Sequence, residues 1–234
     1  MRPSLALTSC LLALSALLVA RPASAALRSP QVPVLGSGLQ AYFNSVGEHI
    51  VVGQDQYDLQ HWVGASNRPT FTFSIELGPK APGDAVGFYS TNESSPALHE
   101  LFPADAMAGW FAVGSFRTGP LRAVVNVFDE SATFRGTHVY LGAERSSFSF
   151  YVSGPHGEFF VEDSRNPGGR AQFLVYAGTY INTGSWWIAG EDSSTAGSDS
   201  DQDYDDVVLF IEDSGCSCSP TVASTWGALK ARFR

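Results

Sequence analysis

Short β-type segments, separated by Gly, Pro, Asn and Ser, recur along most of this chain. Residues 70–75 (TFTFSI) and 147–152 (SFSFYV) alternate polar and apolar side chains, which is typical of strands with one face in a core. Strand spacing of roughly 8–12 residues favours a sandwich or jelly roll. The sequence therefore predicts an all-β fold, a single-domain antiparallel β-sandwich of jelly-roll type. The predicted strands are Thr70–Leu77, Ala85–Tyr89, Trp110–Phe116, Leu121–Phe128, Thr133–Leu141, Ser147–Val152, Glu158–Val161, Ala171–Tyr176, Trp186–Ala189 and Val207–Ile211.

Helical periodicity is confined to Ser95–Met107 and to the C-terminal tail. The many Phe and Trp residues are interpreted as core, and a ligand platform is the competing interpretation. Adjacent Trp186 and Trp187 are predicted to point to opposite faces of their sheet. If one of the two faces solvent, it could stack on a sugar ring.

The first 25 residues have the features of a signal peptide. A basic residue at position 2 precedes the apolar run Leu5–Ala20, and residues 23–25 (ASA) form a small-x-small cleavage site. The run is shorter than the roughly 20 residues that span a bilayer. A lipoprotein-like sequence ends at Cys10, but most of the apolar region follows it, which disfavours lipidation. We therefore expect a secreted protein, extracellular or at the cell surface, that begins at Ala26.

The predicted mature chain is strongly acidic. Removal of Arg2 and Arg21 with the signal peptide leaves 12 of the 14 basic residues against 23 acidic residues, a net charge of about −11. Such a surface repels phosphate backbones, so nucleic acid is not expected as a partner. No other segment is apolar enough to span a membrane. Cations are the natural partners of this charge.

The chain is expected to divide into four parts. Residues 1–25 are the signal peptide, 26–38 an irregular leading segment, 39–213 the β-sandwich domain, and 214–234 a linker with a short basic amphipathic tail. Trp226, Leu229 and Phe233 share one helical face of that tail, which is either a docked terminal turn or a sorting or surface-retention tag. Cys216 and Cys218 lie too close in sequence for an unstrained mutual disulfide and offer too few ligands for zinc.

The usual catalytic signatures are missing from the sequence. It contains no G-x-S-x-G, H-E-x-x-H, P-loop or C-x-x-C motif, and its five His residues are scattered singly. We therefore expect a protein that is not an enzyme. Glycoside hydrolysis remains an alternative because it needs only two carboxylates placed in space. Glu158, Glu162 and Asp163 are the candidates for that chemistry.

Residues 191–213 (EDSSTAGSDSDQDYDDVVLFIED) form the chemically distinctive segment of the chain. Nine of these 23 residues are Asp or Glu, and no Lys or Arg occurs between Ala171 and Leu229. Such a segment is either a solvated loop or is neutralised by a cation. Apolar runs at 186–189 and 207–211 flank it, so we expect both of its ends to be fixed to the core.

The spacing of the acids favours a hard cation. Asp199, Asp201, Asp203 and Asp205 alternate, and oxygen ligands at every second position allow a curved loop to wrap one ion. The pattern is not an EF-hand, because Tyr204 occupies the position of the required Gly and Phe210 that of the bidentate Glu. Several carboxylates on a flexible loop suit calcium better than magnesium or thiolate-preferring metals.

The segment also resembles a known family. Residues 187–192 (WIAGED), a Gly/Ser spacer and residues 201–208 (DQDYDDVV) are similar to the C-terminal signature of a bacterial secreted domain, domain-of-unknown-function family 4114. Val86–Tyr89 and Phe148–Tyr151 look like its glycine-aromatic strands, and residues 166–176 like its Asn-Pro turn and following strand. The resemblance covers residues 69–212. It departs from the family pattern at Asp205, where the family has Asn, and at Gln202, where it usually has a basic residue.

This resemblance implies a β-sandwich of surface or adhesin-like proteins with a presumed calcium site. The ligands implied by position are Glu191, Asp192, Asp201, Asp203 and Asp206. The leading hypothesis is a secreted, non-catalytic, calcium-binding module in cell-surface structure or adhesion, with a surface glycan or another surface protein as its partner. A carbohydrate-binding module, suggested by Trp62, Trp110, Trp186 and Trp187, and a glycan-active hydrolase are the alternatives.

Overall fold

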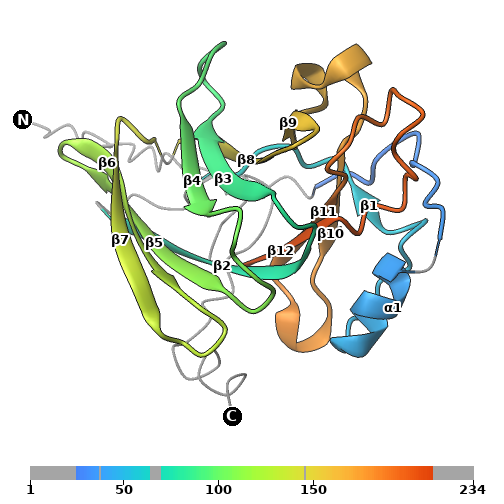
Figure 1. Ribbon diagram of the computed structural model, residues 1–234, viewed down its shortest axis with the longest axis horizontal. Coiled ribbons are helices and arrows are strands. Elements are labelled where there is room, and N and C mark those ends of the chain that lie inside the picture. The colour runs from blue at the N-terminus through green and yellow to red at the C-terminus, as the bar shows by residue number, and fades with distance from the viewer. Residues whose placement is uncertain (1–24, 37, 64–69, 145, 213–234) are drawn as a thin grey trace, which may run out of the picture.

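The computed structural model describes residues 25–36, 38–63, 70–144 and 146–212 and consists of two antiparallel sheets (Figure 1). The predicted signal peptide, the C-terminal tail, Cys216 and Cys218 lie outside these residues. The eight-stranded sheet has the order β1 (Gln56–Tyr57), β10 (Phe173–Ala177), β11 (Trp186–Gly190), β12 (Val207–Glu212), β2 (Thr70–Lys80), β5 (Phe111–Thr118), β6 (Leu121–Phe128) and β7 (Phe134–Leu141). The four-stranded sheet has the order β4 (Leu98–Phe102), β3 (Ala85–Ser90), β8 (Phe148–Gly154) and β9 (Gly157–Phe160).

The two sheets enclose the main core, which confirms the predicted all-β sandwich. Phe88, Phe150 and Val152 from the smaller sheet and Val125, Ile188 and Leu209 from the larger one belong to the same buried cluster. Alternate residues of each strand point into this layer, as the pleat of a strand requires. Each predicted strand is present, with ends that differ by a few residues.

A second core lies on the outer face of β10, β11 and β12. Helix α1 (Gly38–Ser45) covers this face beside the larger sheet (Figure 1). The cluster contains Leu39 and Phe43 of α1, Ile50 and Val52 of the following loop, and the outward side chains Leu174, Tyr176, Trp187, Ala189, Val208 and Phe210. These three strands are therefore buried on both faces, and their sequences are continuously apolar for that reason.

The second core accounts for the two adjacent tryptophans. Trp186 belongs to the cluster between the sheets and Trp187 to the cluster under α1. They point to opposite faces, as predicted, yet only 4% and 5% of their surfaces are exposed. The sequence alternation could not show this, because the residues that cover Trp187 come from more than 130 positions earlier in the chain.

Three elements differ from the sequence predictions. The helical period at Ser95–Met107 was misleading: this segment contains strand β4, whose pairing with β3 and whose buried Leu101 and Phe102 outweigh local propensity. Neither α1 nor β1 was predicted, because α1 presents only two buried side chains and β1 has two residues.

Short 3₁₀ turns occupy Asp163–Arg165, Pro167–Gly169 and Tyr180–Asn182. None of the helices in the described ranges has the length and apolar character to cross a bilayer.

Candidate cation-binding loop and adjoining pocket

The acidic loop, residues 191–206, connects the neighbouring strands β11 and β12. Gly190 at the end of β11 is paired with Val207 at the start of β12, so the loop leaves and re-enters the sheet at one place. Both flanking strands are buried along almost their whole length. The expectation that both ends of the loop are fixed to the core is confirmed.

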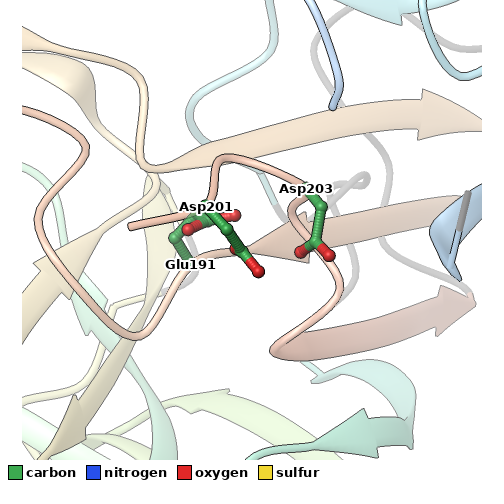
Figure 2. Close-up of side chains that lie close together, drawn as sticks. All are labelled: Glu191, Asp201 and Asp203. Atoms are coloured by element: carbon green, nitrogen blue, oxygen red, sulfur yellow. The ribbon is translucent and has the colours of Figure 1, made fainter. Parts of the chain in front are cut away.

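Three carboxylates of this loop converge, as Figure 2 shows. Glu191, Asp201 and Asp203 each offer one oxygen, and these oxygens lie within 4.8 Å of one another. Glu191 is buried, Asp203 is half-buried and Asp201 is exposed. Calcium–oxygen bonds of roughly 2.3–2.6 Å allow ligand oxygens at most about 5 Å apart, so this spacing fits one calcium ion.

Glu191 is the fully buried member of this group, with none of its surface exposed. Its Oε1 accepts a hydrogen bond from the backbone N–H of Tyr204 at 2.5 Å, and its Oε2 accepts one from the Ser200 hydroxyl. Burial raises the pKa of Glu191, the charges of Asp206 and Asp201 raise it further, and the two hydrogen bonds oppose these effects. A cation beside this carboxylate would compensate for its burial.

The loop turns sharply at two residues that are not glycine. Gln202 and Tyr204 have φ angles of 57° and 58°, in the left-handed region, at a cost of about 1–2 kcal/mol each. Tyr204 is held there by its N–H bond to Glu191 and by its ring, which is 1% exposed in the second core. The loop thus makes a left-handed turn at the position where an EF-hand has Gly, without a glycine.

Asp192 and Asp206, the other two predicted ligands, form a separate pair. The backbone N–H of Asp192 donates to Asp206 Oδ2 at 3.1 Å. Burial and the nearby Asp192 and Asp201 charges raise the pKa of Asp206 to about 6, although the hydrogen bond opposes this. The backbone oxygen of Asp206 accepts from the N–H of Ala81, just after β2. The structure therefore divides the five predicted ligands into a group of three and a pair.

The leading segment packs directly on the acidic loop. A Cβ on Gly36 would lie 3.3 Å from the Cβ of Asp203, and one on Gly38 would lie 1.7 Å from Asp205 Oδ2. Gly38 is the first residue of α1, where a carboxylate is favourably placed against the helix dipole. Burial, followed by the Asp203 carboxylate, raises the pKa of Asp205 to about 6. Asp205 therefore contacts the helix, and the alternating series does not wrap a single ion.

A polar cavity of about 360 Å³ adjoins the same loop. Its walls carry the charged and amide side chains Arg28, Asp58, Gln60, Asp163, Arg170 and Gln202, together with Tyr204. Arg28 forms an ion pair with Asp163 at 2.8 Å, and Gln60 Nε2 donates to Asp58 and Asp163 at 3.1 and 3.3 Å. The volume is in the range of small-ligand sites.

The carboxylates proposed for glycoside hydrolysis are engaged in other contacts. Glu162 accepts from the Tyr89 hydroxyl at 2.8 Å and from Arg165 Nε at 2.5 Å. Asp163 is paired with Arg28. Glu158 is an exposed residue of β9. Two of the three candidates are thus held in ion pairs, and the hydrolase hypothesis stays a prediction.

The tryptophans proposed as a sugar platform are buried. Trp62, Trp110, Trp186 and Trp187 expose 0%, 8%, 4% and 5% of their surfaces, while Trp226 lies outside the described residues. None of these four rings is therefore available to stack on a sugar.

Sequence reasoning missed one carboxylate of this region. Asp84, in the turn between β2 and β3, is completely buried and close enough to Asp192 and Asp206 for their charges to raise its pKa. It is a lone Asp after Pro82-Gly83, which indicates only a turn. Its position near the acidic loop depends on the pairing of β2 with β12.

Comparison with known proteins gives structural neighbours but no family. No family model matches the chain, and no curated protein matches it. One solved structure is a lectin from Chromobacterium violaceum in complex with alpha-methyl-fucoside, with 11% identity and a TM-score of 0.28, covering 66% of this chain and 95% of the lectin. Another is the C-terminal domain of a lectin from Burkholderia cenocepacia, with 14% identity, a TM-score of 0.29, and 65% and 92% of the two chains covered. TM-scores this low assign neither a fold nor a ligand to this chain.

Proposed function

We propose that this protein is an exported, non-catalytic calcium-binding β-sandwich module that acts in bacterial cell-surface structure or adhesion. The observation that carries the calcium site is the convergence of Glu191, Asp201 and Asp203, whose oxygens lie within 4.8 Å of one another. The signal-peptide pattern and the acidic charge support export and a cationic partner. The resemblance to the surface-domain signature supports the assignment to surface structure.

The position of the three carboxylates suggests a structural role for the ion. Glu191 directly follows β11, whereas Asp201 and Asp203 lie on the far limb of the loop, so one ion would bridge the two limbs. The exposed Asp201 gives the ion access from solvent, and the buried Glu191 anchors it to the sheet. Calcium would neutralise like charges that have no basic residue within the loop.

Calcium is expected to raise the melting temperature of the protein, and a chelator to lower it. One site at 100 times its dissociation constant contributes about 2.7 kcal/mol. The measurement is a thermal melt with calcium, with magnesium and with chelator. The double variant Asp201→Asn/Asp203→Asn should lose most of the calcium-dependent gain. The exposed Asp199→Asn, in the same loop but outside the group, is the matched control and should keep it. An equal response to calcium in all three proteins would contradict the proposed site.

Carbohydrate binding is the second candidate function, and the cavity beside the loop is the observation that favours it. Arginine, carboxylate and amide groups converge on this cavity, and paired donors and acceptors of this kind suit sugar hydroxyls. Gln202 and Tyr204 belong both to the cavity wall and to the acidic loop. Calcium that orders the loop would therefore also fix one wall of the cavity.

A glycan-binding assay, on an array followed by calorimetry with the best sugar, tests this second function. We expect Arg170→Ala to weaken binding at least 10-fold, because Arg170 lines the cavity and, among the described residues, its guanidinium donates one hydrogen bond, to the Thr195 backbone oxygen. Arg135→Ala, on strand β7 far from the cavity, is the control. Failure of every sugar to bind, or equal binding by both variants, would contradict the use of this cavity.

A further inference from the structure

Strand β7 leaves one long edge of the larger sheet open. It is the last strand in the sheet order and pairs only with β6, and Figure 1 shows it at the outer margin of the sheet. The strand has eight residues. Its backbone N–H and C=O groups on the side away from β6 have no partner among the described residues. Such a row of unpaired groups is a template on which another strand can pair.

The other three sheet edges each carry a feature that discourages such pairing. Leu27 of the leading segment forms a bridge with Tyr57 along the outer side of β1. The Asn166 side chain bonds both backbone groups of Phe160 in β9, donating to its oxygen at 2.7 Å and accepting from its N–H at 2.8 Å. Strand β4 has five residues and an exposed acid, Glu100, at its centre. Short strands, charged side chains and covering segments are the usual means of protecting an edge.

Strand β7 has none of these protective features. Its sequence, FRGTHVYL, contains no Lys, Pro, Asp or Glu. Its one permanent charge belongs to Arg135, which is neutralised by Asp129 at 2.7 Å. The apolar side chains of Phe134, Val139 and Leu141 are 56%, 54% and 73% exposed. An open edge that also exposes apolar side chains marks an interaction surface.

The distribution of charge favours a second copy of the same chain on this edge. Strands β5, β6 and β7 contain no Asp or Glu, whereas the acidic loop between β11 and β12 belongs to the opposite half of the sheet. The whole chain has a net charge of −9. Two copies therefore repel each other least when they approach through β7. Pairing of β7 with the far edge of another copy is blocked, because the leading segment already lies along β1.

We propose that β7 pairs antiparallel with β7 of a second copy, so that the two larger sheets of a dimer form one continuous sheet. Antiparallel pairing about a twofold axis is self-complementary. A register centred on Val139 places the two Val139 side chains opposite each other and each Leu141 opposite Thr137 of the other copy, so that exposed apolar surface on both strands is covered.

This dimer goes beyond the calcium and carbohydrate functions and depends on neither. The acidic loop follows β11, and the cavity adjoins that loop, so both lie toward the β1 end of the larger sheet. Pairing through β7 leaves them exposed at the two far ends of the joined sheet. Two sites on one particle would strengthen attachment to a surface that carries many copies of a ligand.

The mass of the protein in solution tests the proposal. We would measure it by light scattering after gel filtration and by sedimentation over a series of concentrations. The unmodified protein is expected to have twice the mass of one chain. Val139→Lys places two like charges opposite each other and should weaken the dimer at least 10-fold. Ile181→Lys, at an apolar side chain that is 90% exposed between β10 and β11, is the matched control and should leave the dimer intact.

A charge-reversal experiment separates lost pairing from lost folding. Val139→Glu alone should also be a monomer, for the same reason as Val139→Lys. An equimolar mixture of the two variants should recover twice the mass of one chain, because opposite charges now meet across the twofold axis. Recovery in the mixture requires that both variants are folded and that position 139 of one copy faces position 139 of the other.

Three results would overturn the proposed dimer. The first is an unmodified protein that is a monomer throughout the concentration series. The second is a Val139→Lys variant that dimerises as tightly as Ile181→Lys. The third is a monomeric protein whose melting temperature falls sharply in both Val139→Lys and Leu141→Lys, which would show that another segment of the same chain covers β7.

Discussion

Replacing Trp187 by alanine is expected to lower the free energy of unfolding by about 3–5 kcal/mol. The indole ring is the centre of the second core: its ring centroid lies 4.4 Å from that of Phe210, 5.5 Å from Phe43 and 5.8 Å from Tyr42. Its Nε1 also donates to Glu48 at 2.8 Å. The truncation would leave a cavity between α1 and the sheet that these rigid side chains cannot fill.

Urea unfolding followed by circular dichroism measures this loss. Trp187→Phe keeps most of the buried ring and should lose less than alanine does. Tyr180→Ala, at an aromatic side chain that is 67% exposed, is the control and should change stability little. A loss of less than about 1 kcal/mol for Trp187→Ala would mean that α1 is not packed on this face in solution.

Replacing Glu48 by leucine is expected to lower the free energy of unfolding by a similarly large amount, because it removes hydrogen bonds. Glu48 is 2% exposed, and its carboxylate accepts from the Thr179 N–H at 2.7 Å, the Thr179 hydroxyl at 2.5 Å, Asn182 Nδ2 and Trp187 Nε1. Leucine has nearly the same size but accepts no hydrogen bond, so these buried and half-buried donors lose this acceptor. Each such donor costs about 1–3 kcal/mol, and we expect a total loss of at least about 3 kcal/mol.

The same unfolding measurement on Glu48→Gln, with the exposed Glu130→Gln as control, separates the loss of hydrogen-bond acceptors from the loss of a negative charge. Glu48→Gln keeps one acceptor oxygen and should fall between the unmodified protein and Glu48→Leu, whereas Glu130→Gln should be neutral. Because Glu48 and Trp187 are in contact, the double variant should lose less than the sum of the two single losses. Stability of Glu48→Leu equal to that of the control would contradict the role of this carboxylate.

The strands were predictable because their signal is local. Period-two alternation at 147–152 and apolar runs such as 207–211 reflect burial on the faces of a pleated strand, which a short window reveals. Helix α1 and strand β4 were not predictable in this way. Each is defined by its partner, α1 by the outer face of β10–β12 and β4 by β3, so the neighbouring element outweighs local propensity.

The site was predictable in composition but not in arrangement. Alternating acids and apolar flanks pointed to a cation-binding loop between two strands, and the structure gathers Glu191, Asp201 and Asp203 there. Spacing alone could not show that Asp205 faces the first residue of α1, or that Asp192 and Asp206 form a separate pair. Nor could spacing show that Gln202 and Tyr204, on either side of Asp203, adopt left-handed backbone conformations.

The sequence by itself determined the β class, the order of the strands along the chain and the concentration of negative charge between β11 and β12. It did so because periodicity, turn residues and charge are properties of neighbouring positions. Only the tertiary structure decided that both tryptophans of β11 are buried, that α1 and the loop after it close the second core, and that the turn between β2 and β3 lies near the acidic loop. These facts depend on contacts between residues more than 100 positions apart, and chain topology sets such contacts where no local pattern can.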